Sequence, residues 1–123
     1  MEPLPVYETT IIRPVECRGV GLHSGVPVRL RLAPAPPATG IVFRRTDLDG
    51  FEVPASWQFV QRVSYATSLM RQGVLISTTE HLLSTFFSMG VDNVYVDLDN
   101  LEVPILDGRP FRHRSPFIAA KRA

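Results

Sequence analysis

Apolar and polar residues alternate one by one along much of the first third of the chain. Val28, Leu30 and Leu32 lie on one side of an extended backbone there, with arginines between them on the other side. A period of two is typical of a β-strand that buries one face. A similar pattern runs from Thr9 to Leu22, and the stretch 22–25 (LHSG) has the residues of a turn, so we predict an antiparallel hairpin.

Further strands and one helix follow. Residues 41–48 and parts of 51–70 are strand candidates, and apolar residues alternate again in 94–98 and, more briefly, in 102–106. A helix is expected to begin near Ser77. Several strands, one clear helix and then more strands predict an α+β domain. In such a domain helices pack on one face of a mainly antiparallel sheet, which makes a two-layer sandwich.

Length and composition limit the broad class of protein. A chain of 123 residues with 45% hydrophobic and 20% charged residues fits one globular domain. The net charge of +1 gives no strong field for nucleic acid, and no apolar run is long enough to span a membrane. A single cysteine, Cys17, excludes an internal disulfide, and the N-terminus has no signal-peptide pattern. We therefore expect a cytoplasmic protein with no nucleic-acid partner and no transmembrane segment.

The start of the predicted helix carries an acidic residue and a histidine side by side. Residues 77–80 match a capping box, in which the Glu80 carboxylate reaches back to the Ser77 amide. The alternative is chemical: Glu80 is a catalytic base and His81 is a metal ligand. The free amides and the dipole of a helix N-terminus would also help to hold an anionic group there. The local pattern leaves both interpretations of Glu80 open.

The predicted helix has an apolar sector and an uncharged polar face. The sector comprises Leu82, Leu83, Phe86, Phe87 and Met89. His81 faces nearly opposite, among small hydroxyl side chains, so it is not a core histidine. After Glu80 the helix has no charged residue. A face of this composition suits contact with another protein surface.

Known metal-site spacings give at most one ligand in this chain. The HExxH pattern needs a second histidine where Thr85 stands, and HxxEH needs one where Ser77 stands. A catalytic zinc normally has three protein ligands and an open position for water. The histidines of the whole chain are His23, His81 and His113, so a zinc site built from this chain alone would be short of ligands.

Six sequence blocks occur in a characteristic order. They are GVGLHSG, APAPPATGIVFRRTDL, ATSL, ISTTEHLLS, GVDNVYVDL and EVPILDG. In order and approximate spacing they resemble the N-terminal domain of UDP-3-O-acyl-N-acetylglucosamine deacetylase, the zinc-dependent enzyme of the committed step in lipid A biosynthesis. The resemblance runs from Tyr7 to Gly108 and covers less than half of a full-length family member. It implies a layered α+β fold like that of ribosomal protein S5 domain 2.

The resemblance also implies roles for particular residues. In the family, the glutamate of the TxEH block is the general base that activates zinc-bound water, and the adjacent histidine is a zinc ligand. Glu80 and His81 occupy these positions. Ser64 and Tyr65 match positions that line the pocket for the UDP-sugar lipid substrate. His23 resembles a family histidine near the active site, in a supporting role, and a simple turn histidine is an equal alternative.

Family members consist of two similar α+β domains with the zinc site between them, which implies that part of the site is missing here. The other ligands, a histidine and an aspartate spaced four apart, and a late catalytic histidine belong to the second domain. We expect residues 1–108 to form the N-terminal domain of such an enzyme and to be inactive alone. Residues 109–123 form a divergent tail with five of the thirteen basic residues. Ser115 and Pro116 in this tail are typical of a helix start, so a short helix is predicted there.

Two alternatives to an inactive N-terminal domain stay open. A half-size enzyme would self-associate and take ligands in trans from His23 or His113. A non-catalytic binding module or remnant of the same fold would use the Arg-rich tail, because fold does not fix function, and its nucleic-acid binding would fall steeply with salt. The departure from the family pattern at Arg109 indicates either an altered helix or a fragment made by a shifted reading frame.

Overall fold

A computed structural model of the chain describes residues 7–21, 23–63, 66–104 and 117–121, which form ten strands, one α-helix and two short 3-10 helices. In chain order these elements are β1 (Tyr7–Ile11), β2 (Val15–Val20), β3 (Pro27–Pro34), β4 (Ile41–Arg45), η1 (Thr46–Leu48), β5 (Phe51–Pro54), η2 (Trp57–Phe59), β6 (Val60–Val63), β7 (Ala66–Arg71), β8 (Val74–Ile76), α1 (Glu80–Met89), β9 (Val94–Leu98) and β10 (Phe117–Lys121).

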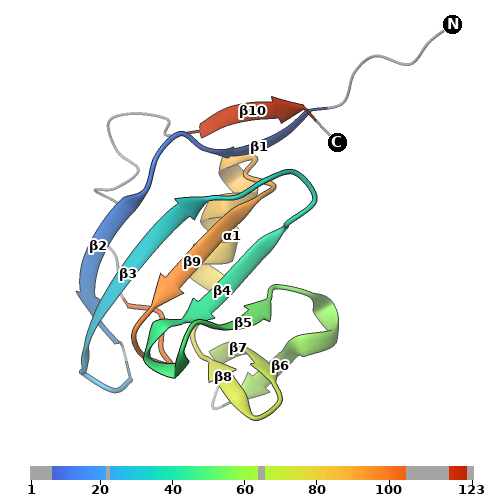
Figure 1. The fold of residues 1–123 in the computed structure, drawn as a ribbon. Coiled ribbons are helices and arrows are strands. Elements are labelled where there is room, and N and C mark those ends of the chain that lie inside the picture. The colour runs from blue at the N-terminus through green and yellow to red at the C-terminus, as the bar shows by residue number, and fades with distance from the viewer. Residues whose placement is uncertain (1–6, 22, 64–65, 105–116, 122–123) are drawn as a thin grey trace, which may run out of the picture.

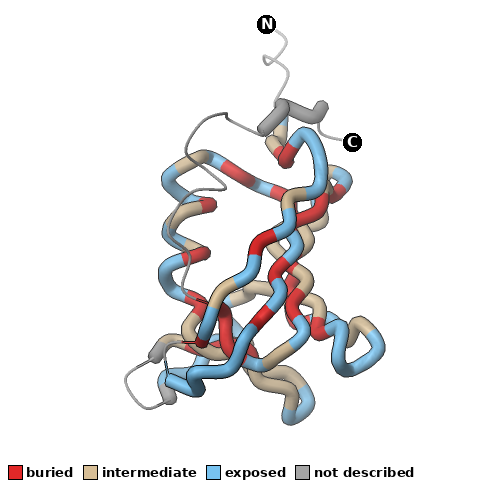
Figure 2. The backbone as a smooth tube through the Cα atoms, turned by 90° about the vertical axis from the view of Figure 1, so that its left-hand side faces the viewer, coloured by how far each residue is buried: buried red, intermediate tan, exposed pale blue. Residues whose placement is uncertain are grey.

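The central sheet has five strands in the order β2-β3-β9-β4-β5 (Figure 1). Neighbouring strands run antiparallel except β4 and β9, which are parallel. Helix α1 lies along one face of this sheet, and the turned view in Figure 2 shows the helix on one side and the sheet on the other. This arrangement confirms the predicted two-layer α+β fold. Among the described residues there is no helix with the length and apolar character of a membrane span.

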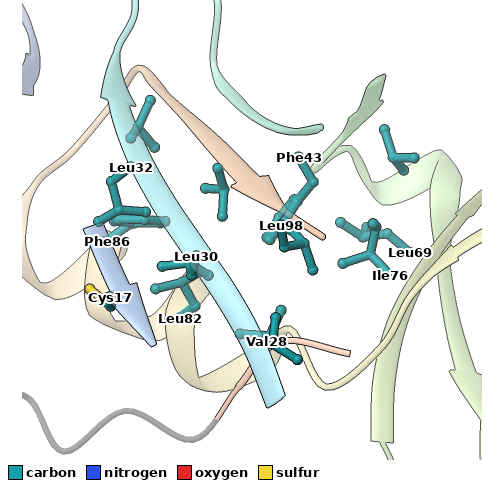
Figure 3. Close-up of a cluster of buried hydrophobic side chains, with 14 of the residues drawn as sticks. Cys17, Val28, Leu30, Leu32, Phe43, Leu69, Ile76, Leu82, Phe86 and Leu98 are labelled. Carbon is teal, nitrogen blue, oxygen red and sulfur yellow. The ribbon is translucent and has the colours of Figure 1, made fainter. Parts of the chain in front are cut away.

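The core lies between α1 and the sheet. Val28, Leu30 and Leu32 point inward along β3 and are 2%, 0% and 0% exposed, as the period of two predicted. Leu82 and Phe86 of α1 face this strand (Figure 3). β2 and β3 pair antiparallel from Val15↔Leu32 to Val20↔Pro27, which confirms the predicted hairpin.

A second sheet, with the strand order β6-β7-β8, joins the same core (Figure 1). Leu69 in β7 and Ile76 in β8 are fully buried and belong to one cluster with Phe43 and Leu98 of the central sheet (Figure 3). Because β8 ends shortly before α1 begins, this small sheet leads the chain directly into the start of the helix.

The outer face of the central sheet is covered by charges that pair with one another. Asp97 on β9 accepts hydrogen bonds from Arg44 on β4 at 2.5 and 3.0 Å and forms an ion pair with Arg31 on β3 at 3.4 Å. The Arg44 guanidinium also lies 3.9 Å from the centroid of the Tyr95 ring. These groups satisfy one another in water, so this face has the character of a solvent-facing surface.

The end of the chain forms a strand, and the short helix predicted for the tail is wrong for the part that the structure describes. β10 pairs antiparallel with β1, from Tyr7↔Lys121 to Ile11↔Phe117. An edge strand has free backbone donors and acceptors that a neighbouring strand can satisfy and a helix cannot. This pairing between distant segments outweighs the local helix signal. Ser115 and Pro116, which carried that signal, lie outside the described residues.

Candidate functional site

Helix α1 begins at Glu80 without the capping box that was one of the two interpretations of residues 77–80. The Ser77 amide donates instead to the carbonyl oxygen of Leu101, at 2.6 Å. Thr79 is the N-cap residue, and its amide and hydroxyl both donate to the carbonyl oxygen of Thr67 in β7, at 3.0 and 3.2 Å. The predicted cap is therefore wrong, because contacts with other segments already use the groups that a capping box needs.

Glu80 and His81 are both exposed. Within the described part of the chain, neither the Glu80 carboxylate nor the His81 imidazole makes a hydrogen bond or an ion pair. The Thr85 hydroxyl donates to the backbone carbonyl of His81, at 2.9 Å, and this bond does not involve the imidazole. The first turn of a helix also has free amides and a positive dipole end, which favour negative charge. A carboxylate, an imidazole and an electropositive helix end thus lie together.

The outward side of α1 carries an exposed aromatic residue. Phe87 is 88% exposed, so its predicted place in the buried apolar sector is wrong, whereas the other predicted members of that sector are buried or partly buried. The helix fully buries a narrow stripe, Leu82 and Phe86, because it rests on the sheet along one line of contact. Glu80, Ser84 and Phe87 follow one another at spacings of four and three and therefore share one side of the helix.

The backbone just before α1 is in a rarely used conformation. Thr78 has a φ of 61°, in the left-handed region that a β-branched residue seldom adopts. Such a conformation costs about 1–3 kcal/mol and persists where the surroundings fix it. Ser77 provides that constraint on one side, since its amide donates to Leu101 and its carbonyl accepts from the Val103 amide at 3.0 Å. Strained residues of this kind cluster at functional sites, and this one lies two residues before Glu80.

A buried carboxylate, Glu102, connects two of the sequence blocks. Glu102 is 2% exposed and accepts hydrogen bonds from the amides of His23 and Ser24, both at 3.0 Å, and from the Thr78 hydroxyl at 3.2 Å. Burial alone raises the pKa of Glu102, but these amide and hydroxyl donors outweigh burial and lower the pKa below its ordinary value. The sequence patterns did not reveal this residue. Its signal was a single acid inside the apolar run LEVPIL, because a buried charge must be paired or hydrogen-bonded.

The structure brings His23 to the entrance of the helix. Its backbone amide and the Thr78 hydroxyl donate to the same oxygen, Oε2 of Glu102. The His23 side chain is exposed and makes no hydrogen bond within the described part of the chain. Its predicted supporting role stays a prediction. Ser64 and Tyr65, predicted to line a substrate pocket, lie outside the described residues.

The described residues do not form a complete metal site by themselves. Among them, no three His, Cys, Asp or Glu side chains come together as a metal would require. The donor set at the helix start still fits part of such a site, since an exposed imidazole can serve as one zinc ligand and an adjacent carboxylate as a base. A zinc ion held at His81 would need its other ligands from outside the described residues.

Comparison with known proteins gives the family of this chain. The family model described as UDP-3-O-acyl N-acetylglycosamine deacetylase matches residues 8–117. The UDP-3-O-acyl-N-acetylglucosamine deacetylase of Solibacter usitatus is 78% identical over 102 residues, which are 83% of this chain and 35% of that protein. The protein of the same name from Ruthia magnifica is 49% identical over 113 residues, which are 92% of this chain and 36% of that protein. The chain thus spans about a third of the length of these curated relatives. It belongs to the UDP-3-O-acyl-N-acetylglucosamine deacetylase family.

Proposed function

We propose that this chain supplies the general base and one zinc ligand of an enzyme that hydrolyses the N-acetyl group of UDP-3-O-acyl-N-acetylglucosamine in lipid A biosynthesis. The observation that carries the proposal is the exposed pair of Glu80 and His81 at the start of α1. The segments around this pair are held by bonds that use neither side chain. Both groups therefore remain available for chemistry, in a chain whose relatives are named for this deacetylation.

The roles of the residues follow from their chemistry. His81 would hold zinc together with ligands from outside this chain. When bound, zinc would act as a Lewis acid that polarises an amide carbonyl and lowers the pKa of a water molecule. The Glu80 carboxylate takes a proton from the attacking water and passes it to the leaving amine. The free amides at the start of α1 favour the negative charge that develops nearby.

We also propose that the remaining part of the protein covers the outward side of α1. Phe87 is 88% exposed on the same side as Glu80, and beyond Glu80 the helix has no charged residue. A helix face that stays in water normally carries charges, whereas an exposed aromatic side chain among hydroxyl groups suits a protein contact. The missing zinc ligands would then lie opposite His81, and the UDP-sugar lipid would bind in between. His23, Ser64 and Tyr65 stay predictions for substrate contact.

The test uses a completed protein, in which this chain is joined to the part of the Solibacter usitatus relative that follows the aligned region. We expect zinc-dependent deacetylation by the completed protein and none by this chain alone. Glu80→Gln and His81→Ala should each lower kcat by roughly 10²–10⁴, because each removes a group that acts in the reaction. The matched control is Glu52→Gln, which changes another exposed carboxylate and should leave kcat unchanged. Turnover by the chain alone, or a fully active Glu80→Gln protein, would contradict the proposal.

A further inference from the structure

We propose that Glu102 is a positioning residue for this site. Its carboxylate fixes the loop between β2 and β3 (the His23 loop, residues 21 and 23–26) to Thr78, and it thereby sets where Glu80 and His81 stand. The inference rests on the proposed function, because it assigns the purpose of Glu102 to the reaction of that pair.

The geometry shows one carboxylate serving two separate segments. Oε2 of Glu102 accepts from the His23 amide at 3.0 Å and from the Thr78 hydroxyl at 3.2 Å, and Oε1 accepts from the Ser24 amide at 3.0 Å. His23 and Thr78 are far apart in the sequence, yet both donate to the same oxygen atom. The carboxylate therefore ties the position of the His23 amide to that of the Thr78 hydroxyl.

Each of the two segments is already closed by backbone bonds of its own. In the His23 loop, the Gly21 amide donates to the carbonyl of Val26 at 3.0 Å and the Gly25 amide to the carbonyl of Gly21 at 2.9 Å. At the helix entrance, Ser77 is bonded through its amide and its carbonyl to the segment around Glu102. The side chain of Glu102 is thus not needed to form either segment. The backbone of the segment around Glu102 also meets both of them, through the bridges Ser77↔Glu102 and Gly21↔Pro104. What the side chain adds is a direct link from the amides of His23 and Ser24 to the Thr78 hydroxyl.

The loop approaches the carboxylate so closely that a side chain at position 21 would have to displace its neighbours. A Cβ atom on Gly21 would overlap the Oε1 atom of Glu102 and the hydroxyl oxygen of Ser24. Gly21 is not in the left-handed region, so this close approach, and not backbone freedom, is the constraint at this position. The fit holds the carboxylate in one place against the loop.

Thr78 transmits this position to the reacting pair. Its φ of 61° turns the chain immediately before α1, and its hydroxyl bond to Glu102 is the side-chain contact that joins it to the His23 loop. Glu80 and His81 follow two and three residues later as the first residues of the helix. Loss of that hydroxyl bond would let the turn relax and would shift both side chains, and small misplacements of reacting groups are costly to catalysis.

The first experiment compares Thr78→Val and Thr78→Ser in the completed protein. Valine keeps the shape of threonine without its hydroxyl, whereas serine keeps the hydroxyl. We expect Thr78→Val to lower kcat at least about tenfold, while KM and the amount of bound zinc stay nearly unchanged. Thr78→Ser should keep kcat within about threefold of the wild-type value. Ser77→Ala is the matched control, because it removes a neighbouring hydroxyl that contacts Thr78 and not Glu102. Equal kcat values for all four proteins would overturn the proposal.

The second experiment uses this chain alone and needs no activity. In ¹H–¹⁵N NMR spectra, Thr78→Val and Glu102→Gln should each shift the amide signals of His23 and of residues 80–82, and Ser77→Ala should not. Shifts confined to residues 77–82, with the His23 amide signal unmoved, would overturn the positioning role, and the Thr78 variant decides this even if Glu102→Gln does not fold. If the NMR result is as expected while the completed wild-type protein has no deacetylase activity, the proposed function fails and the connection made by Glu102 stands.

Discussion

The inward and outward sides of the α1 entrance differ in whether their polar side chains are hydrogen-bonded to other segments. On the inward side, the buried Thr79 hydroxyl and the buried Glu102 carboxylate are both hydrogen-bonded to other segments. On the outward side, Glu80 and His81 are exposed and make no side-chain bond within the described part of the chain. The bonded groups fix the positions of backbone segments, and the unbonded groups are those to which we assign the chemistry. Stability and activity should therefore respond to different substitutions.

The largest contrast is expected between two neighbouring phenylalanines. Phe86 is 0% exposed and Phe87 is 88% exposed. Phe86→Ala should lower the free energy of unfolding by about 3–5 kcal/mol, because it leaves a cavity between α1 and the sheet. Phe87→Ala should change it by less than about 0.5 kcal/mol. Urea unfolding of the two variants of this chain measures both values, and similar losses would show that the outward side is part of the core.

A second contrast concerns the two glutamates. Glu102→Ala should cost about 3 kcal/mol of unfolding free energy, since it leaves three part-buried donors, the amides of His23 and Ser24 and the Thr78 hydroxyl, without their acceptor. Glu80→Ala should change it by less than about 0.5 kcal/mol, because the exposed carboxylate has no side-chain partner among the residues that the structure describes. Thermal and urea unfolding would measure the difference. A loss at Glu80 as large as at Glu102 would restore its interpretation as a structural residue.

A smaller effect is expected at Gly21. Gly21→Ala should destabilise the chain by about 1–2 kcal/mol, because the added methyl group displaces the Glu102 carboxylate or the Ser24 side chain. The same substitution made together with Glu102→Ala should cost much less than it does alone, since the group that it meets has gone. A cost that is the same in both backgrounds would mean that Gly21 is required for another reason.

The smallest effect should be seen in the acid range. The pKa of Glu102 in the folded chain lies below the ordinary value of 4.5, so the charged carboxylate stabilises the fold above that pH. This contribution is lost as the pH falls through the folded-state pKa. As the pH decreases below about 4.5, the free energy of unfolding of Glu102→Gln should therefore fall less steeply than that of wild type. The paired Asp47, whose pKa the hydrogen-bonded Arg45 guanidinium also lowers, is present in both proteins and cancels in the comparison. Parallel acid unfolding curves would contradict this role of Glu102.

The features that sequence predicted well are those fixed by local periodicity. The inward residues of β3 and β9 and the hairpin of β2 and β3 follow from alternation, and the α+β order follows from the elements. The failures arise where distant segments decide. The Ser77 amide is bonded to Leu101, and β1 pairs with β10, so local signals for a capping box and a terminal helix were overridden. Glu102 was not found because its donors come from segments far away in the sequence.

At the site, the sequence block located Glu80 and His81, while their roles came from the family resemblance. The structure shows that both side chains are exposed and that neither makes a hydrogen bond or an ion pair with the rest of the described chain. It adds Glu102 and the strained Thr78, which are hydrogen-bonded to each other at the turn just before these two residues. The other ligands that a zinc ion at His81 would need could not be found from this sequence, and the described residues bring no three metal-binding side chains together.

The most direct test of the central claim, that this chain holds part of a zinc site, is a zinc titration by calorimetry. This chain, the completed protein and its His81→Ala variant would be compared. We predict that the completed protein binds one zinc ion, and that the chain alone and the His81→Ala variant bind it at least about a hundredfold more weakly, because each lacks ligands of the site. Equally tight binding by the chain alone, or no loss of affinity with His81→Ala, would contradict the claim.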